Sequence, residues 1–182
     1  PEELRRLLNL MVGELNASHS GISGPSSAGL TEPVGRLGAQ WDRVAFETRG
    51  RLQIAELIAD GPLALAGGIA VGDVITHVDS TPISASTNLD AVLRHTVGRK
   101  VVLTVVSGTA APRSVEVQPI SGGAEKQLLY RAWVESRRAY VHRVSDGRLG
   151  YVHMLDMSEQ SLQRLYTDLD TENYGRDGVV ID

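Results

Sequence analysis

The sequence contains no cysteine, which excludes disulfides, thiol catalysis and cysteine-ligated metal sites. Its five histidines are scattered, without an HExxH motif or a pair spaced four residues apart, so we expect no metal site and no cofactor. No apolar run approaches the roughly 20 residues needed to span a bilayer. Positive charge is also scarce: Lys100 and Lys126 are the only lysines, and the net charge is −4. We therefore expect neither nucleic acid nor a membrane as a partner.

What is present indicates a globular protein. Of its 182 residues, 42% are hydrophobic and 22% are charged, and the length suffices for one domain plus parts of another. Residues 2–16 carry leucine and methionine at helical spacing, with Glu2 and Glu3 at the expected start and Asn16 as a C-cap. Residues 20–33 are a linker rich in glycine, serine and proline.

Residues 34–120 change to a strand pattern. Residues 38–47 and 51–59 read as two strands of a hairpin around Thr48-Arg49-Gly50, and residues 63–66 as a short helical turn. Further along, we expect a strand at 72–78, a helix at 89–96 capped by Asn88, and strands at 101–106 and 114–119.

The last third predicts two strands at 128–134 and 139–144, a strand at 149–154 and a helix that follows the cap residue Ser158. The last strand, residues 178–182, is apolar without alternation, which predicts burial on both faces. Because no segment remains to cover it, we interpret the chain as truncated.

A resemblance to a known fold family rests on residues 60–75, DGPLALAGGIAVGDVI. This stretch resembles the GSPA-x-x-AG-(I/L)-x-x-GD-x-(I/L) signature of PDZ domains, and the resemblance covers about residues 34–120. PDZ domains bind peptides by adding a strand to a sheet edge, with the peptide carboxylate held by backbone N–H groups.

By this resemblance, the carboxylate loop is residues 35–38 and the edge strand is residues 39–41, with the helix after Asn88 as the other wall. The peptide-binding residues implied are Gly35, Leu37, Gly38, Ala39, Trp41, Leu89 and Val92. The bulky Trp41 departs from the simpler apolar edge of the family, so its ring would fill part of the groove. The alternative is a PDZ fold that serves only as a spacer.

Both flanks resemble one family of peptidases. Residues 11–20 (MVGELNASHS) resemble the M-x-GEL-x-(A/T)-SH segment of tricorn-type serine peptidases. Residues 147–157 (GRLGYVHMLDM) and 177–182 (DGVVID) are similar to two later strands of the same family. The segments follow in the family's order, with the PDZ domain between them.

The resemblance implies a catalytic role for His19 and Ser18. His19 would be the general base that activates a serine, and Ser18 its polar neighbour; imidazole suits this task because its pKa lies near neutrality. In the family the nucleophilic serine, a glutamate and the oxyanion donors follow this segment, so we place them beyond Asp182 and expect this chain alone to be inactive. The alternative is structural, with His19 capping a helix and Ser18 an ordinary loop residue. His153 is interpreted as a core residue or as one that supports the site residues from behind.

The sequence thus predicts an α+β fold in three parts: an N-terminal helical segment with a linker (1–33), a PDZ domain formed as a small β-barrel or sandwich with two helices (34–120), and the start of an incomplete α/β peptidase core (121–182). The resemblance implies peptide substrates, a homo-oligomeric full-length protein, and the cytoplasm, with the periplasm as the alternative. Two other functions stay open: a C-terminal processing peptidase with a Ser-Lys dyad, and a non-catalytic PDZ adaptor.

Overall fold

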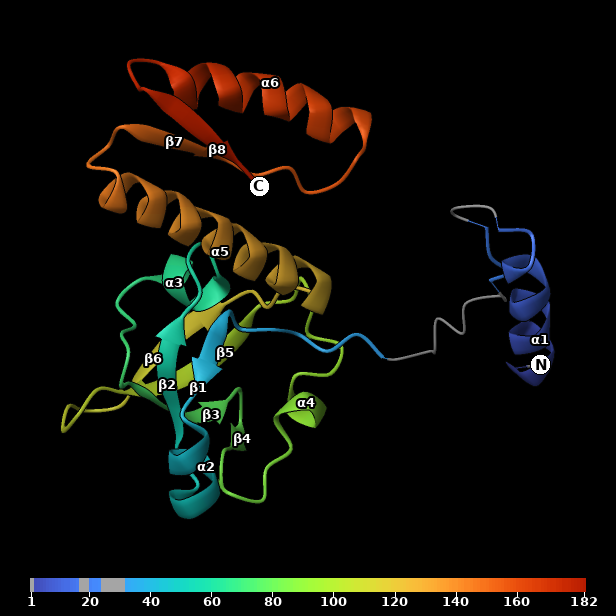
Figure 1. The fold of residues 1–182 in the computed structure, drawn as a ribbon. Helices are drawn as coiled ribbons and strands as arrows, with labels where there is room; N and C mark the ends of the chain where they lie inside the picture. The colour runs from blue at the N-terminus through green and yellow to red at the C-terminus, as the bar shows by residue number, and fades with distance from the viewer. Residues whose placement is uncertain (1, 17–19, 24–31) are drawn as a thin grey trace. The chain divides into compact units, whose positions relative to one another are not determined.

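The computed structural model describes residues 2–16, 20–23 and 32–182, which form two compact units, Pro1–Glu32 and Pro33–Asp182 (Figure 1). The elements in chain order are α1 (Glu2–Gly13), β1 (Ala39–Trp41), α2 (Arg43–Arg49), β2 (Leu52–Leu57), α3 (Pro62–Ala66), β3 (Val74–Val78), β4 (Thr81–Pro82), α4 (Leu89–Val92), β5 (Val101–Val106), β6 (Arg113–Val117), α5 (Gly122–Val144), β7 (Leu149–Val152), α6 (Glu159–Asn173) and β8 (Gly178–Ile181).

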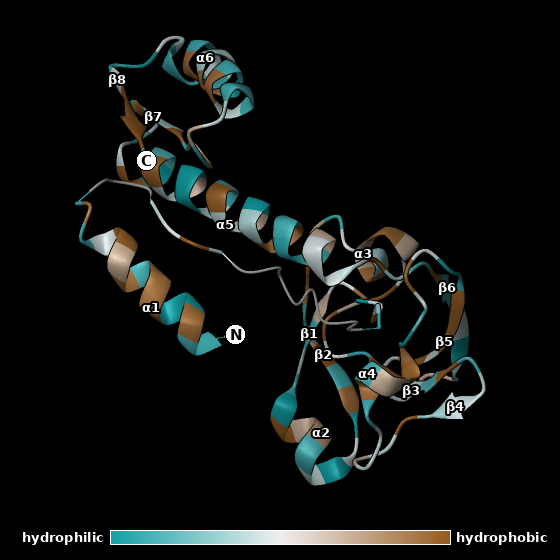
Figure 2. Cartoon of the chain, turned by 90° about the vertical axis from the view of Figure 1, so that its right-hand side faces the viewer, coloured by the Kyte–Doolittle hydropathy of each residue, from teal (hydrophilic) through white to brown (hydrophobic). Residues whose placement is uncertain are grey.

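The first unit is built on the amphipathic helix α1, whose apolar and polar stripes are visible in Figure 2. Asn16 follows the helix with a φ of 48°, the left-handed conformation that was predicted for a C-cap asparagine. Asn9 binds the backbone of Ile22 through both atoms of its amide, each at 2.9 Å. The segment 20–23 therefore returns alongside α1.

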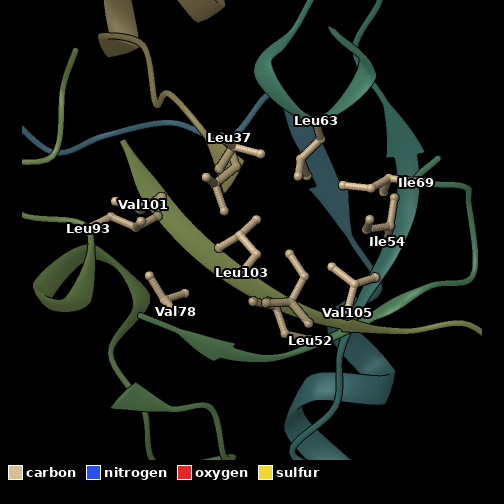
Figure 3. Packing of buried hydrophobic residues seen from close by; sticks show 12 residues of the cluster. Leu37, Leu52, Ile54, Leu63, Ile69, Val78, Leu93, Val101, Leu103 and Val105 are labelled. Atoms are coloured by element: carbon tan, nitrogen blue, oxygen red, sulfur yellow. The ribbon is translucent and has the colours of Figure 1, made fainter. Parts of the chain in front are cut away.

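The PDZ segment folds around one antiparallel sheet, with strand order β1-β2-β3-β5-β6 and the short β4 paired with β3. This sheet is open, so of the barrel or sandwich that the sequence predicted, the structure does not form a closed barrel. An isolated bridge between Arg36 and Ile120 joins the segment before β1 to the segment after β6. Buried leucine, isoleucine and valine side chains fill the space over the sheet (Figure 3): Leu37, Leu52, Ile54, Leu63, Ile69, Ile75, Val78, Leu93, Val101, Leu103, Val105 and Val117.

The predicted hairpin at 38–59 is wrong because a helix, α2, separates its two strands. Asp42 caps this helix by accepting the Ala45 N–H at 2.8 Å, and Gly50 ends it with a φ of 63°. The two cap residues favour a helix more strongly than the β-forming residues between them favour a strand. The short helix α4 confirms Asn88 as a cap but ends at Val92, earlier than predicted.

The two strands predicted at 128–134 and 139–144 are also wrong, since both lie in the single 23-residue helix α5. Ser121 caps α5 by accepting the Ala124 N–H at 3.1 Å. Partly buried positions recur at Leu128, Val134, Arg138 and Val141, a helical spacing that the aromatic and β-branched residues between them obscured.

The strands β7 and β8 pair in parallel, and both α5 and α6 contact β7. Ser158 caps α6 as predicted, by accepting the Ser161 N–H at 3.2 Å. β8 is not buried on both faces in this chain, since Val180 is 39% and Ile181 59% exposed. This exposure agrees with the prediction that the strand lacks its covering partner here.

Candidate functional site

Ser18 and His19, the predicted catalytic pair, lie outside the residues that the structure describes. Their roles therefore stay predictions that rest on the sequence. The predicted peptide-binding groove lies within the described residues.

The carboxylate loop starts with two backbone N–H groups that are already bound inside the domain. Gly35 donates its N–H to the Leu93 carbonyl at 2.8 Å, and Arg36 donates to the Ile120 carbonyl at 2.8 Å. Gly35 has no room for a side chain, since a Cβ there would lie 2.2 Å from Thr96 Oγ1 and 2.7 Å from Pro119 Cβ. These residues hold the loop in place but offer no N–H to a ligand.

Gly38 presents the N–H that could bind a carboxylate. Its φ of 73° is a left-handed conformation that glycine adopts without strain. Its carbonyl accepts the Ile58 N–H at 3.0 Å, while its own N–H donates to Glu125 Oε1 of α5 at 3.2 Å. A carboxylate from the chain itself therefore lies at the predicted carboxylate loop.

β1 has an open edge. The bond between Ile58 and Gly38 makes that pair a hydrogen-bonded one, so Ala39, opposite Leu57, takes the non-hydrogen-bonded position. The backbone N–H and C=O of Ala39 then face away from β2. This is the geometry that an added peptide strand needs.

The side chains of the groove are mostly half-buried. Leu37 is only 3% exposed and lies in the core, so it can contribute to binding only through its backbone (Figure 3). Ala39, Trp41, Leu89 and Val92 are partly buried against the same core. Trp41 thus packs on the domain itself.

We expect Gly38→Ala to destabilise the protein by about 1–3 kcal/mol, because alanine is strained at this φ. The added Cβ would also lie 2.7 Å from Pro62 Cδ and 2.8 Å from Gly61 Cα. Urea unfolding measures the loss. Gly108 also has a positive φ, but there is open space where its Cβ would lie. Gly108→Ala therefore measures the backbone strain without the clash. Equal losses in the two variants would contradict the close packing of the loop.

A second cluster of polar groups lies where β7 and β8 end. Tyr151 donates its hydroxyl hydrogen to Asp182 Oδ2 at 2.6 Å. Burial is the larger cause and this hydrogen bond the second cause that raise the pKa of Tyr151 to about 12. Tyr130 of α5 hydrogen-bonds His153 Nε2, whose ring Trp133 also contacts edge-on. His153 Nδ1 is buried 3.4 Å from Asp182 and makes no hydrogen bond to the residues that the structure describes. Sequence reasoning placed His153 in the core but missed these partners.

Glu172 joins three elements and was not singled out from the sequence. It is 8% exposed and accepts hydrogen bonds from His142 Nε2 at 2.9 Å and from the Tyr151 N–H at 3.2 Å. Arg138 and Arg176 lie within ion-pair distance, at 3.3 and 3.2 Å. The one sequence signal for this role is weak: an acidic residue near the C-terminal end of α6.

In the part of the chain that the structure describes, no three histidine or acidic side chains gather in a way that could hold a metal ion. No helix among these residues is long and apolar enough to cross a membrane.

The fold and the sequence together define the class of the middle segment. Residues 35–118 match the family described as the PDZ domain. The antiparallel sheet, the loop at Gly38 and the open edge at Ala39 agree with this match. These residues are a PDZ domain, as the signature at 60–75 predicted.

The whole chain is similar to proteins named for tricorn protease. It is 36% identical to Tricorn protease homolog 1 of Streptomyces coelicolor over 192 residues, which cover 100% of this chain and 17% of that protein. It is 31% identical to the Tricorn protease homolog of Saccharolobus solfataricus, covering 99% of this chain and 17% of the relative. The chain thus spans about a sixth of the length of these relatives.

The fold agrees with this similarity. The crystal structure of the tricorn protease matches 93% of this chain with a TM-score of 0.77 at 24% identity, over 17% of that chain. The resemblance to tricorn-type peptidases that the flanking motifs carried is confirmed, and so is the mixed helix and sheet fold. The chain corresponds to a PDZ-containing segment of the tricorn proteases.

Proposed function

We propose that this chain is part of a tricorn-like serine peptidase that hydrolyses oligopeptides, and that His19 is its general base. The similarity to tricorn protease homologues over the whole chain carries this proposal. In this proposal Ser18 is the polar neighbour of the base, and the nucleophile, a glutamate and the oxyanion donors belong to sequence that follows Asp182. Replacement of His19 in the full-length protein tests the proposal.

The three-part division at 33/34 and 120/121 belongs to the same proposal. Residues 1–33 would supply the base, residues 34–120 a peptide-binding domain, and residues 121–182 the first strands of the catalytic core. The parallel pairing of β7 and β8 supports the last assignment, since parallel strands are typical of α/β cores. A homo-oligomeric full-length protein and a cytoplasmic location rest on the resemblance alone.

The PDZ domain is proposed to bind peptides at the open edge of β1. The outward-facing backbone of Ala39 supports strand addition, and the N–H of Gly38 supports recognition of a carboxylate. The non-catalytic adaptor is the second candidate that these observations favour, because peptide binding by the PDZ domain does not need His19.

A peptide with a free C-terminal carboxylate is expected to bind this chain more tightly than the same peptide amidated. The reason is that a hydrogen bond to a charged acceptor contributes about 1.5–3 kcal/mol, more than a bond to a neutral acceptor. Calorimetric titration of the two peptides measures the difference. Equal affinities would remove carboxylate recognition at Gly38 from the proposal while leaving strand addition intact.

A further inference from the structure

We propose that Glu125 is a built-in competitor for the PDZ carboxylate loop: its side chain takes the place at the Gly38 N–H that the C-terminal carboxylate of a bound peptide would take. This inference rests on the proposed peptide binding. The contact that carries it is the hydrogen bond from the Gly38 N–H to Glu125 Oε1, at 3.2 Å in a part-buried position.

The chain delivers Glu125 to the loop by short-range geometry. Arg36 and Ile120 exchange two backbone hydrogen bonds, at 2.8 and 3.0 Å, which anchor the start of α5 beside the loop. Ser121 then caps the helix, and Glu125 comes one turn later. Gly38 and Glu125 lie 87 residues apart in the sequence. The backbone bridge holds the start of α5 beside the loop, so Glu125 needs only one helix turn to reach Gly38.

The first turn of α5 lies beside Arg36. Gly122 starts the helix without a side chain, and a Cβ at this position would lie 3.9 Å from Arg36 Nε. The guanidinium of Arg36 therefore lies beside the helix start. It pairs with Asp90 at 3.0 Å.

A second contact between α5 and the PDZ domain is a surface one. Arg131 lies 3.5 Å from Asp60, and both side chains are well exposed, so this ion pair holds the helix weakly. Displacement of Glu125 by a peptide is therefore opposed mainly by the contact at Gly38. Tyr130 of α5 also bonds His153, and Arg138 of α5 bonds the Tyr151 carbonyl. A peptide at the loop therefore competes with a side chain of the helix that joins the PDZ domain to the β7–β8 pair.

The competition predicts a specific change in affinity. When a binding-competent state is only partly populated, the apparent dissociation constant rises in proportion, and removal of the competitor reverses this. We expect Glu125→Ala to strengthen binding of a free-carboxylate peptide by about fivefold or more and to leave binding of the amidated peptide unchanged. Glu125→Gln keeps the length of the side chain but not its charge, so we expect an intermediate gain.

The test is a titration of this chain and its variants with the same peptide in free-acid and amidated forms. Glu135→Ala on α5 is the matched control, because Glu135 is exposed and pairs with Arg138 of its own helix. The amide proton of Gly38, followed by NMR, should shift in Glu125→Ala and not in Glu135→Ala. Glu125→Gln provides the same comparison with the least disturbance to the fold.

Three results would overturn parts of the account, and they differ. A preference for the free acid that is the same in the wild type and in Glu125→Ala overturns the competitor alone. Equal binding of acid and amide in every variant overturns both the competitor and carboxylate recognition. If neither peptide binds the wild type or any variant, both the competitor and the proposed peptide-binding function are overturned.

Discussion

Glu172→Ala is expected to destabilise the α5–β7–α6 region by about 2–4 kcal/mol, a value reduced from that of a fully buried pair because the partner cations reach solvent. The variant leaves the Tyr151 N–H without its acceptor and His142 without its partner. It also removes the acidic group that Arg138 and Arg176 share. The loss is large because three elements lose a common anchor at once.

Amide hydrogen exchange at Tyr151 and Val152 measures this loss locally, and urea unfolding measures it globally. Asp170→Ala on α6 is the matched control, since Asp170 is an exposed acidic residue on the same helix. We expect the control to stay within about 0.5 kcal/mol of the wild type. A Glu172 variant as stable as this control would show that the network does not hold the region together.

The same residue predicts a dependence of stability on pH. Burial raises the pKa of Glu172, but hydrogen bonds from His142 and the Tyr151 N–H, together with the charges of Arg176 and Arg138, lower it by more, so the net shift is downward. A lowered carboxyl pKa contributes stability that is fully present above the unfolded value of about 4.3 and is lost as pH falls through the folded value. The wild type should therefore lose more stability than Glu172→Ala on acidification below about pH 4.3.

Local sequence signals predicted the fold where one residue decides the conformation. Asn88 and Ser158 were expected as helix caps, and the described structure confirms both. The two helices that were missed are α2 and α5, where β-branched and aromatic residues favoured strands. Asp42 and Ser121 cap these helices with the same kind of side-chain hydrogen bond that Asn88 and Ser158 make. The surrounding apolar residues favoured strands and were given more weight in the prediction.

The candidate groove could be predicted only in part. The motif at 60–75 located the PDZ domain, and the loop at Gly38 followed from it. The occupant of that loop could not be found from sequence, because Glu125 reaches Gly38 through a bridge between Arg36 and Ile120 that no local pattern encodes. For the same reason the hub at Glu172 and the contact of Asp182 with Tyr151 were missed: both join residues more than 20 positions apart.

His19→Ala is expected to have the largest effect on function. The serine hydroxyl is a weak nucleophile unless a base within hydrogen-bond reach accepts its proton, and alanine cannot do so. Loss of the base from a unit of this type lowers turnover by roughly a thousandfold or more. His77→Gln is the control, because His77 lies in β3 of the PDZ domain, where its Nδ1 lies 3.2 Å from the neighbouring Thr76 hydroxyl.

The central claim is that this chain supplies the catalytic base of a serine peptidase whose other groups lie elsewhere in the full-length protein. The most direct measurement is the hydrolysis of short fluorogenic peptides by the full-length protein, by its His19→Ala variant with circular dichroism to show that it folds, and by this chain alone. The account predicts turnover by the wild type, turnover lower by roughly a thousandfold or more in the folded variant, and none by the chain alone. Unchanged turnover in His19→Ala, or hydrolysis by a clean preparation of this chain, would contradict it.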